Sequence, residues 1–91
     1  MKKVWQVKYY EGDHLQVTKG FFSVLYKAID YCRTINSNLG SCMIYECFLD
    51  EVIDEVRPYG LPINVEDGIS LYLLSDAVKD RIYASHMRIK N

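Results

Sequence analysis

The sequence predicts a small α+β single domain over residues 1–91. Its expected order is a β-hairpin, a helix and a third strand (ββαβ), then a short acidic element and a C-terminal helix. Ninety-one residues suffice for one hydrophobic core and are too few for two. Two segments near the N-terminus, Val4 to Tyr10 and Leu15 to Thr18, alternate apolar and polar side chains, as strands do, whereas later segments repeat apolar residues at helical spacing. A hydrophobic fraction of 49% excludes an intrinsically disordered chain.

The N-terminal segment from Val4 to Tyr10 has the period of two that is typical of a half-buried strand. A short polar break at residues 11–13 includes Gly12, which tolerates a tight turn, and the alternation resumes from Leu15 to Thr18. We therefore expect a β-hairpin. The residues of its first strand that should face the core are Trp5, Val7 and Tyr9.

The next segment has apolar residues at i, i+3, i+4, i+7 and i+10 from Leu25, which mark one face of an α-helix. We predict a helix from about Val24 to Asn36, with Ser23 as a candidate N-cap. The following run from Cys42 to Leu49 is apolar on both faces except at Glu46. Such a run predicts a central strand that is covered on at least one side.

The C-terminal half leaves two structural alternatives open. Residues 50–57 form the acidic element, a two-turn helix or a strand, which ends at Pro58 because the residue before proline is pushed out of the α region. Residues 64–67 contain two possible helix caps, and residues 69–74 either begin the C-terminal helix or form a fourth strand. Both alternatives give a helix from Asp76 to about His86.

Charge is unevenly distributed along the chain. The net charge of −1 argues against an obligate polyanion binder, so we do not expect nucleic acid as the main partner. Residues 46–80 nevertheless carry two Lys/Arg against nine Asp/Glu, a charge of −7. Such a block is usually a solvated face, but it is also suited to a basic partner.

Known catalytic and cofactor motifs are absent from the sequence. It contains no nucleotide-binding glycine motif, no HExxH and no GxSxG, so we expect neither enzymatic activity nor a cofactor. Three cysteines without CxxC spacing indicate buried thiols rather than disulfides or a zinc site. No apolar stretch is long enough for a membrane span or a signal peptide, which favours a cytoplasmic protein that is not membrane-bound.

Candidate binding residues come from the acidic element and from the tyrosines. Eight tyrosines exceed the number expected for this length, and tyrosine is enriched at protein interfaces. We expect Tyr9, Tyr45 and Tyr72 to pack in the core and others to be surface anchors. The residues predicted to bind a partner are Glu51, Asp54, Glu55 and Tyr59.

One resemblance rests on Val4-Trp5-Gln6-Val7, on Gly20-Phe21-Phe22-Ser23, on Ala28 and Tyr31 in the helix, and on Tyr45-Glu46. Over residues 3–50 this pattern resembles small phage and prophage accessory proteins that begin with a strand-strand-helix-strand unit. The resemblance implies a phage-encoded, non-catalytic protein in the host cytoplasm, one that acts by binding host components, including defence systems.

The predicted function is therefore to bind and inhibit a host factor, or to sequester a small ligand. The first alternative is a small metal-dependent enzyme that acts on a nucleotide or phosphate compound, with the carboxylates between Asp50 and Glu55 holding the ion. The second is weak nucleic-acid binding through the lysines at positions 2, 3 and 8 beside Trp5 and Tyr10.

Self-association, most simply as a homodimer, is the last expectation. A chain of this size has a thin core, and four consecutive apolar residues cover more of a helix or strand than one packing face can bury. The predicted oligomer interface, at the C-terminal helix or an open sheet edge, includes Leu71, Tyr72, Leu73 and Leu74.

Overall fold

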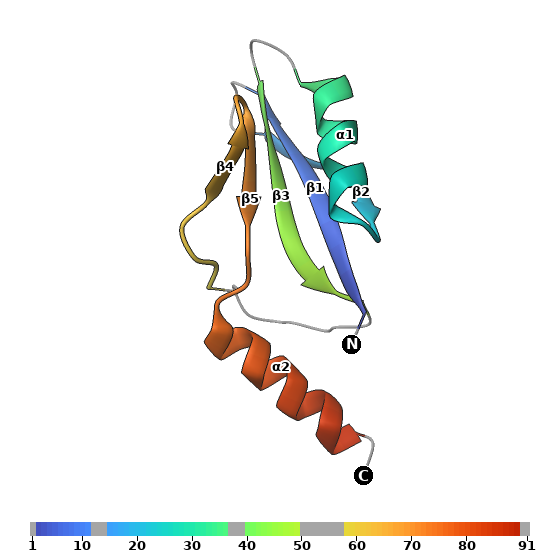
Figure 1. Ribbon diagram of the computed structural model, residues 1–91, viewed down its shortest axis with the longest axis vertical. Coiled ribbons are helices and arrows are strands. Elements are labelled where there is room, and N and C mark those ends of the chain that lie inside the picture. The colour runs from blue at the N-terminus through green and yellow to red at the C-terminus, as the bar shows by residue number, and fades with distance from the viewer. Residues whose placement is uncertain (1, 12–14, 37–39, 50–57, 90–91) are drawn as a thin grey trace.

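The computed structural model describes residues 2–11, 15–36, 40–49 and 58–89, which form a five-stranded mixed sheet and two helices (Figure 1). The prediction of a small α+β domain is confirmed. The predicted acidic element at residues 50–57 lies outside the described residues.

The sheet has the strand order β2-β1-β3-β5-β4. Its strands are β1 (Lys3–Glu11), β2 (Leu15–Phe22), β3 (Gly40–Phe48), β4 (Ile63–Glu66) and β5 (Ile69–Tyr72). β1 pairs antiparallel with β2 and β3, β5 runs parallel to β3, and β4 pairs antiparallel with β5. β3 is therefore the central strand, as its apolar sequence on both faces predicts.

Helix α1 (Leu25–Ile35) packs against one face of the sheet and matches the helix predicted for residues 24–36. Its buried residues, Ala28 and Cys32, are one turn apart and both small, so the helix can approach the strands closely. The prediction of Ser23 as N-cap is wrong. Val24 occupies that position, and no side chain caps the helix.

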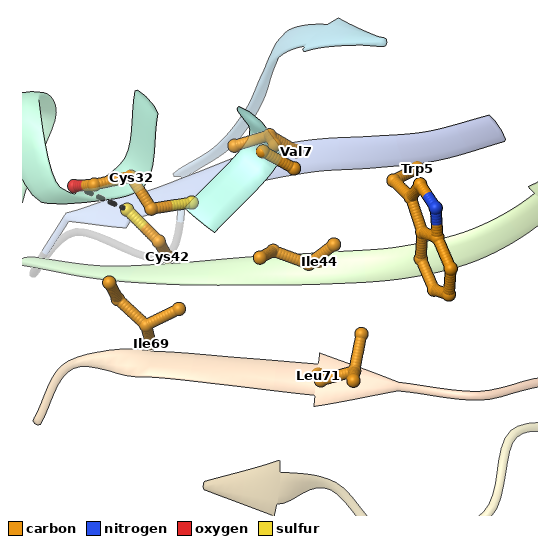
Figure 2. Close-up of a cluster of buried hydrophobic side chains, with 8 residues drawn as sticks. Trp5, Val7, Cys32, Cys42, Ile44, Ile69 and Leu71 are labelled. Carbon is orange, nitrogen blue, oxygen red and sulfur yellow. Dashed lines mark hydrogen bonds between the residues drawn. The ribbon is translucent and has the colours of Figure 1, made fainter. Parts of the chain in front are cut away.

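The core lies between α1 and the sheet (Figure 2). Alternate residues of three neighbouring strands point into it, namely Trp5, Val7, Cys42, Ile44, Ile69 and Leu71. The predicted inward orientation of Trp5 and Val7 is confirmed, and Tyr9 packs half-buried against the same cluster. Gly40 lies where the Tyr9 ring crosses β3, and a Cβ at this position would collide with the Tyr9 hydroxyl.

Residues 69–72 of this segment form strand β5 and Leu74 makes an isolated β-bridge, so the helical interpretation is wrong for this stretch. β5 lies beside β3, where burial of Ile69 and Leu71 completes the core, and this pairing outweighs the local helical spacing. Residues 64–67 do not cap a helix, because they belong to β4 and the turn to β5. The C-terminal helix α2 (Asp76–Ile89) includes the residues from Asp76 to about His86 that both alternatives made helical.

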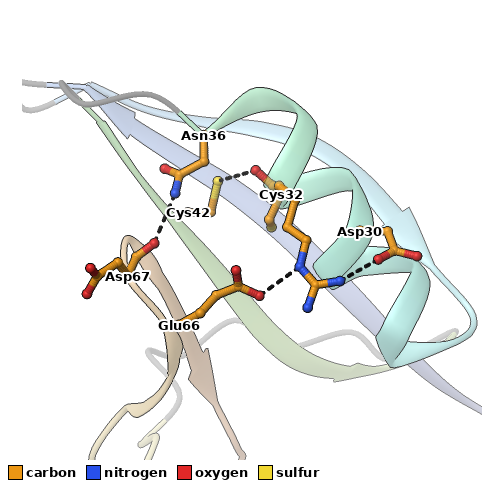
Figure 3. A network of polar contacts seen from close by, with 7 residues as sticks. Asp30, Cys32, Asn36, Cys42, Glu66 and Asp67 are labelled. Carbon is orange, nitrogen blue, oxygen red and sulfur yellow. Dashed lines mark hydrogen bonds and ion pairs between the residues drawn. The ribbon is translucent and has the colours of Figure 1, made fainter.

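Polar contacts join the end of α1 to the β4–β5 hairpin (Figure 3). Arg33 Nε lies 2.7 Å from Glu66 Oε1, and Arg33 Nη1 lies 2.8 Å from Asp30 Oδ1. Asn36 Nδ2 donates to the Asp67 carbonyl at 3.1 Å. These contacts hold the hairpin beside the helix.

Helix α2 extends beyond the end of the sheet and gives the molecule its longest dimension, 49 Å against 23 and 19 Å (Figure 1). Val78, in the first turn of α2, is buried, whereas most of the following described residues are exposed. Within the described ranges, neither helix is long and apolar enough to cross a membrane.

Candidate functional site

The sheet face opposite α1 is the candidate binding site, and we call it the tyrosine face. Strand register assigns to it one set of alternating residues, and no helix within the described residues packs on it. The exposed face of such a sheet is usually polar. Here its apolar and aromatic members are the exposed Phe21, the buried Cys47 and the partly exposed Val4, Tyr10, Met43, Tyr45 and Tyr72. An apolar face of this kind is typical of an interaction surface.

Three tyrosine rings form a contiguous row at the centre of the tyrosine face. Tyr45 and Tyr72 are register partners on β3 and β5, and their rings stack with centroids 4.6 Å apart and an interplanar angle of 11°. Tyr59 meets Tyr45 edge-on at 5.2 Å and Tyr72 at 6.4 Å. Each ring is therefore held by its neighbours.

Lys8 extends this row, because its Nζ lies over the Tyr45 ring, 5.2 Å from the centroid. β1 and β5 flank β3 on opposite sides, so Lys8 and Tyr72 approach the Tyr45 ring from opposite directions. Burial, and then the neighbouring Tyr72, raise the pKa of the Tyr45 phenol, so this phenol is neutral at physiological pH. Among the described residues that the register assigns to this face, Lys8 is the one charged residue.

Of the predicted partner-binding residues, the structure places Tyr59 on the tyrosine face. Tyr59 forms a β-bridge with Leu74, and its hydroxyl donates to the Glu46 carbonyl at 3.3 Å. The other three predicted residues, Glu51, Asp54 and Glu55, lie outside the described residues.

The expectation that Tyr45 and Tyr72 pack in the core is wrong, because the period-two pattern places both on the opposite side of the sheet from the core residues Ile44 and Leu71. Because Tyr45 and Tyr72 were expected in the core, the sequence did not lead to a prediction of the tyrosine face. The available signal was the alternation Ile69-Ser70-Leu71-Tyr72, which puts Tyr72 on the side away from two aliphatic residues.

The residues of the predicted oligomer interface are separated by the strand. Leu71 and Leu74 are buried within the chain, and Leu73 packs half-buried against the core. Tyr72 lies on the tyrosine face. Because Leu71 and Leu74 are buried and Leu73 is half-buried, these residues leave little of the exposed apolar surface on which the prediction of an oligomer interface rested.

Glu46 is the buried carboxylate nearest to this site, with 1% of its side chain exposed. Lys3 Nζ lies 3.9 Å from its Oε2, and Lys79 Nζ lies 3.3 Å from its Oε1. The Lys79 contact is an ion pair without hydrogen-bond geometry, since Oε1 has no hydrogen-bond donor. Lys79 belongs to α2, so the pair joins the first turn of this helix to β3.

Nucleophilic and metal chemistry find little support in the described residues. All three thiols are buried, as predicted, and burial followed by the neighbouring Cys42 raises the pKa of Cys32 to about 12. A thiol with such a pKa is a poor nucleophile. Within the described ranges, no cluster of three or more His, Cys, Asp or Glu side chains could hold a metal ion.

Comparisons with protein-family models, with curated proteins and with solved structures each find no match.

Proposed function

We propose that this chain is a non-catalytic binding protein that engages a protein partner through the tyrosine face. The observation that carries this proposal is the row of Tyr45, Tyr59 and Tyr72 on a sheet face that no described helix covers. The resemblance to phage accessory proteins makes a host protein, such as a defence component, the partner to test first. Inhibition of that protein would follow if the face covers its active surface.

Pre-organisation of the rings supports a protein-binding role. Ordering a side chain at an interface costs about 0.5–1.5 kcal/mol when the side chain is mobile in the free protein. Mutual packing of the three rings, together with the hydrogen bond from Tyr59 to Glu46, reduces this cost before any partner arrives. Tyrosines in such settings are frequent energetic centres of interfaces.

Two features disfavour nucleic acid as the ligand of the tyrosine face. A base would have to stack on an accessible ring, but Tyr72 and Lys8 already approach the Tyr45 ring from either side. A polyanion also needs several cations, whereas Lys8 is the one charged residue among the described residues that the strand register assigns to this face.

Photo-crosslinking provides a direct test. Benzoylphenylalanine replaces Phe21, which is 63% exposed on the tyrosine face, and in a control it replaces Tyr26, which is 61% exposed on α1. We expect a discrete adduct with a host protein from position 21 and none from position 26. Equal adducts from both positions, or none from either, would contradict the proposal.

Affinity measurements with the purified partner complete the test. Tyr45→Ala and Lys8→Glu should each weaken binding at least about tenfold, which corresponds to about 1.4 kcal/mol, whereas Tyr26→Ala should change it less than about twofold. Circular dichroism checks that each variant is folded. An adduct between two copies of the chain at position 21 would instead assign the tyrosine face to the predicted homodimer.

A further inference from the structure

We infer that α2 positions Tyr59 and thereby regulates the binding competence of the tyrosine face. This inference rests on the proposed function for its consequence, but its structural basis is separate. Helix α2 is connected to the described residues of the sheet at its N-terminal end, and the same joint carries Tyr59.

The joint consists of two short segments paired through their backbones. The Gly60 amide donates to the Leu73 carbonyl at 3.3 Å, and the Ser75 amide donates to the Pro58 carbonyl at 3.3 Å. The Tyr59–Leu74 bridge lies between these bonds. Ser75 directly precedes α2, so the backbone of Tyr59 is bonded to the residues from which the helix starts.

A second set of contacts fixes the first turn of α2 to the sheet. Val78 is buried, and Lys79 pairs with the buried carboxylate of Glu46. The carbonyl of Glu46 accepts the hydrogen bond from the Tyr59 hydroxyl. Glu46, in the central strand, therefore makes both the ion pair that fixes α2 and the hydrogen bond that fixes Tyr59.

The consequence is a coupling between two sites on opposite faces of the sheet. The register places Glu46 opposite Trp5, on the α1 face, whereas Tyr59 packs on the tyrosine face. When Lys79 holds α2 in place, Leu74 and Ser75 hold Tyr59 against Tyr45. If α2 tilts, these residues move with it, and the row loses its third ring. Binding at the face and docking of α2 must then favour each other, because coupling between sites is reciprocal.

The first test needs no partner. The protein is labelled with 3-fluorotyrosine, and the Tyr59 resonance is assigned by its loss in Tyr59→Phe. We expect Lys79→Met and Lys79→Glu to shift and broaden this resonance. The matched control is Arg33→Met, which removes the 2.7 Å ion pair to Glu66 at the far end of α1. Folding of each variant is checked by circular dichroism. A Tyr59 resonance unchanged in both Lys79 variants, or changed as much by Arg33→Met, would overturn the inference.

The second test measures the consequence for binding. With a partner of the tyrosine face, Lys79→Met should weaken affinity by about three- to tenfold although Lys79 is not on that face, and Arg33→Met should leave it unchanged. Unaltered affinity beside an altered Tyr59 resonance would refute the regulation while leaving the tyrosine face as the binding surface. A fluorine response without any partner for the face would count against the proposed function alone.

Discussion

At the scale of single residues, Gly68 shows how one backbone angle positions two elements. It closes the β4–β5 turn with φ = 78°, a conformation that L-residues other than glycine rarely adopt. A Cβ here would lie 2.6 Å from Asn36 Nδ2, the atom that donates to the Asp67 carbonyl. The turn thus depends on glycine for both its conformation and its contact with the end of α1.

Gly68→Ala should therefore lower the free energy of unfolding by about 1–3 kcal/mol, from the left-handed backbone and the weakened Asn36 hydrogen bond. Urea denaturation followed by circular dichroism measures the change. Gly60→Ala is the matched control, because a Cβ at Gly60 meets no atom within 4 Å. Equal losses in the two variants would show that the turn does not require glycine.

At the scale of elements, the joint between β3 and α2 depends on a buried charge. Glu46 is almost fully buried, whereas Lys79 is 34% exposed. Removing the lysine and removing the carboxylate should therefore change the free energy of unfolding by different amounts. Without Lys79, the carboxylate remains buried with the more distant Lys3 as its partner. Without the carboxylate, both lysines can turn toward water.

We expect Lys79→Met to destabilise the fold by about 1–3 kcal/mol, below the value for a fully buried pair because Lys79 is partly solvated. Glu46→Met should cost less, since methionine fills a similar volume and leaves no buried charge. The double variant should be no less stable than Lys79→Met alone. Thermal and urea unfolding of the three variants decide the order, and a larger loss in Glu46→Met would contradict it.

At the scale of the whole molecule, the buried thiols make stability depend on alkaline pH. The pKa of Cys32 rises from about 9 to about 12, mainly through burial, and burial also raises the pKa of Cys42. Below about pH 9 both thiols are protonated in the folded and unfolded chain, so they contribute no pH dependence. Between about pH 9 and 12 the unfolded chain loses these protons and the folded chain keeps them, so stability falls as pH rises.

Cys32→Ala should reduce this slope by up to about 1.4 kcal/mol per pH unit, the limit for one proton. Urea unfolding at intervals from pH 7 to 11 measures the slope in both proteins, and the difference between the two slopes is the contribution of Cys32. The alanine variant should also show a pH-independent loss from the missing sulfur atom. Identical slopes above pH 9 would show that Cys32 ionises equally in both states.

Several parts of this structure follow from local sequence patterns. Alternation of apolar and polar residues predicts the N-terminal strands, and helical spacing predicts α1 within one residue at each end. The same spacing predicts the helical residues from Asp76 to about His86, but it also extended the helix wrongly into residues 69–74. Side-chain orientation along one strand or one helix repeats with a fixed period, so neighbouring residues suffice to decide it.

The tertiary structure alone decided the placement of β4 and β5 and, with it, the tyrosine face. β5 pairs with β3 in parallel across a connection of some twenty residues, and no local pattern specifies which strand it joins or in what register. That register stacks Tyr45 on Tyr72 and directs Leu71 inward. Contacts between residues far apart in the chain, such as Glu46 with Lys79, also depend on long-range packing. The sequence by itself therefore determined β1, β2, α1, β3 and the body of α2, whereas the assembled sheet determined β4, β5 and the site.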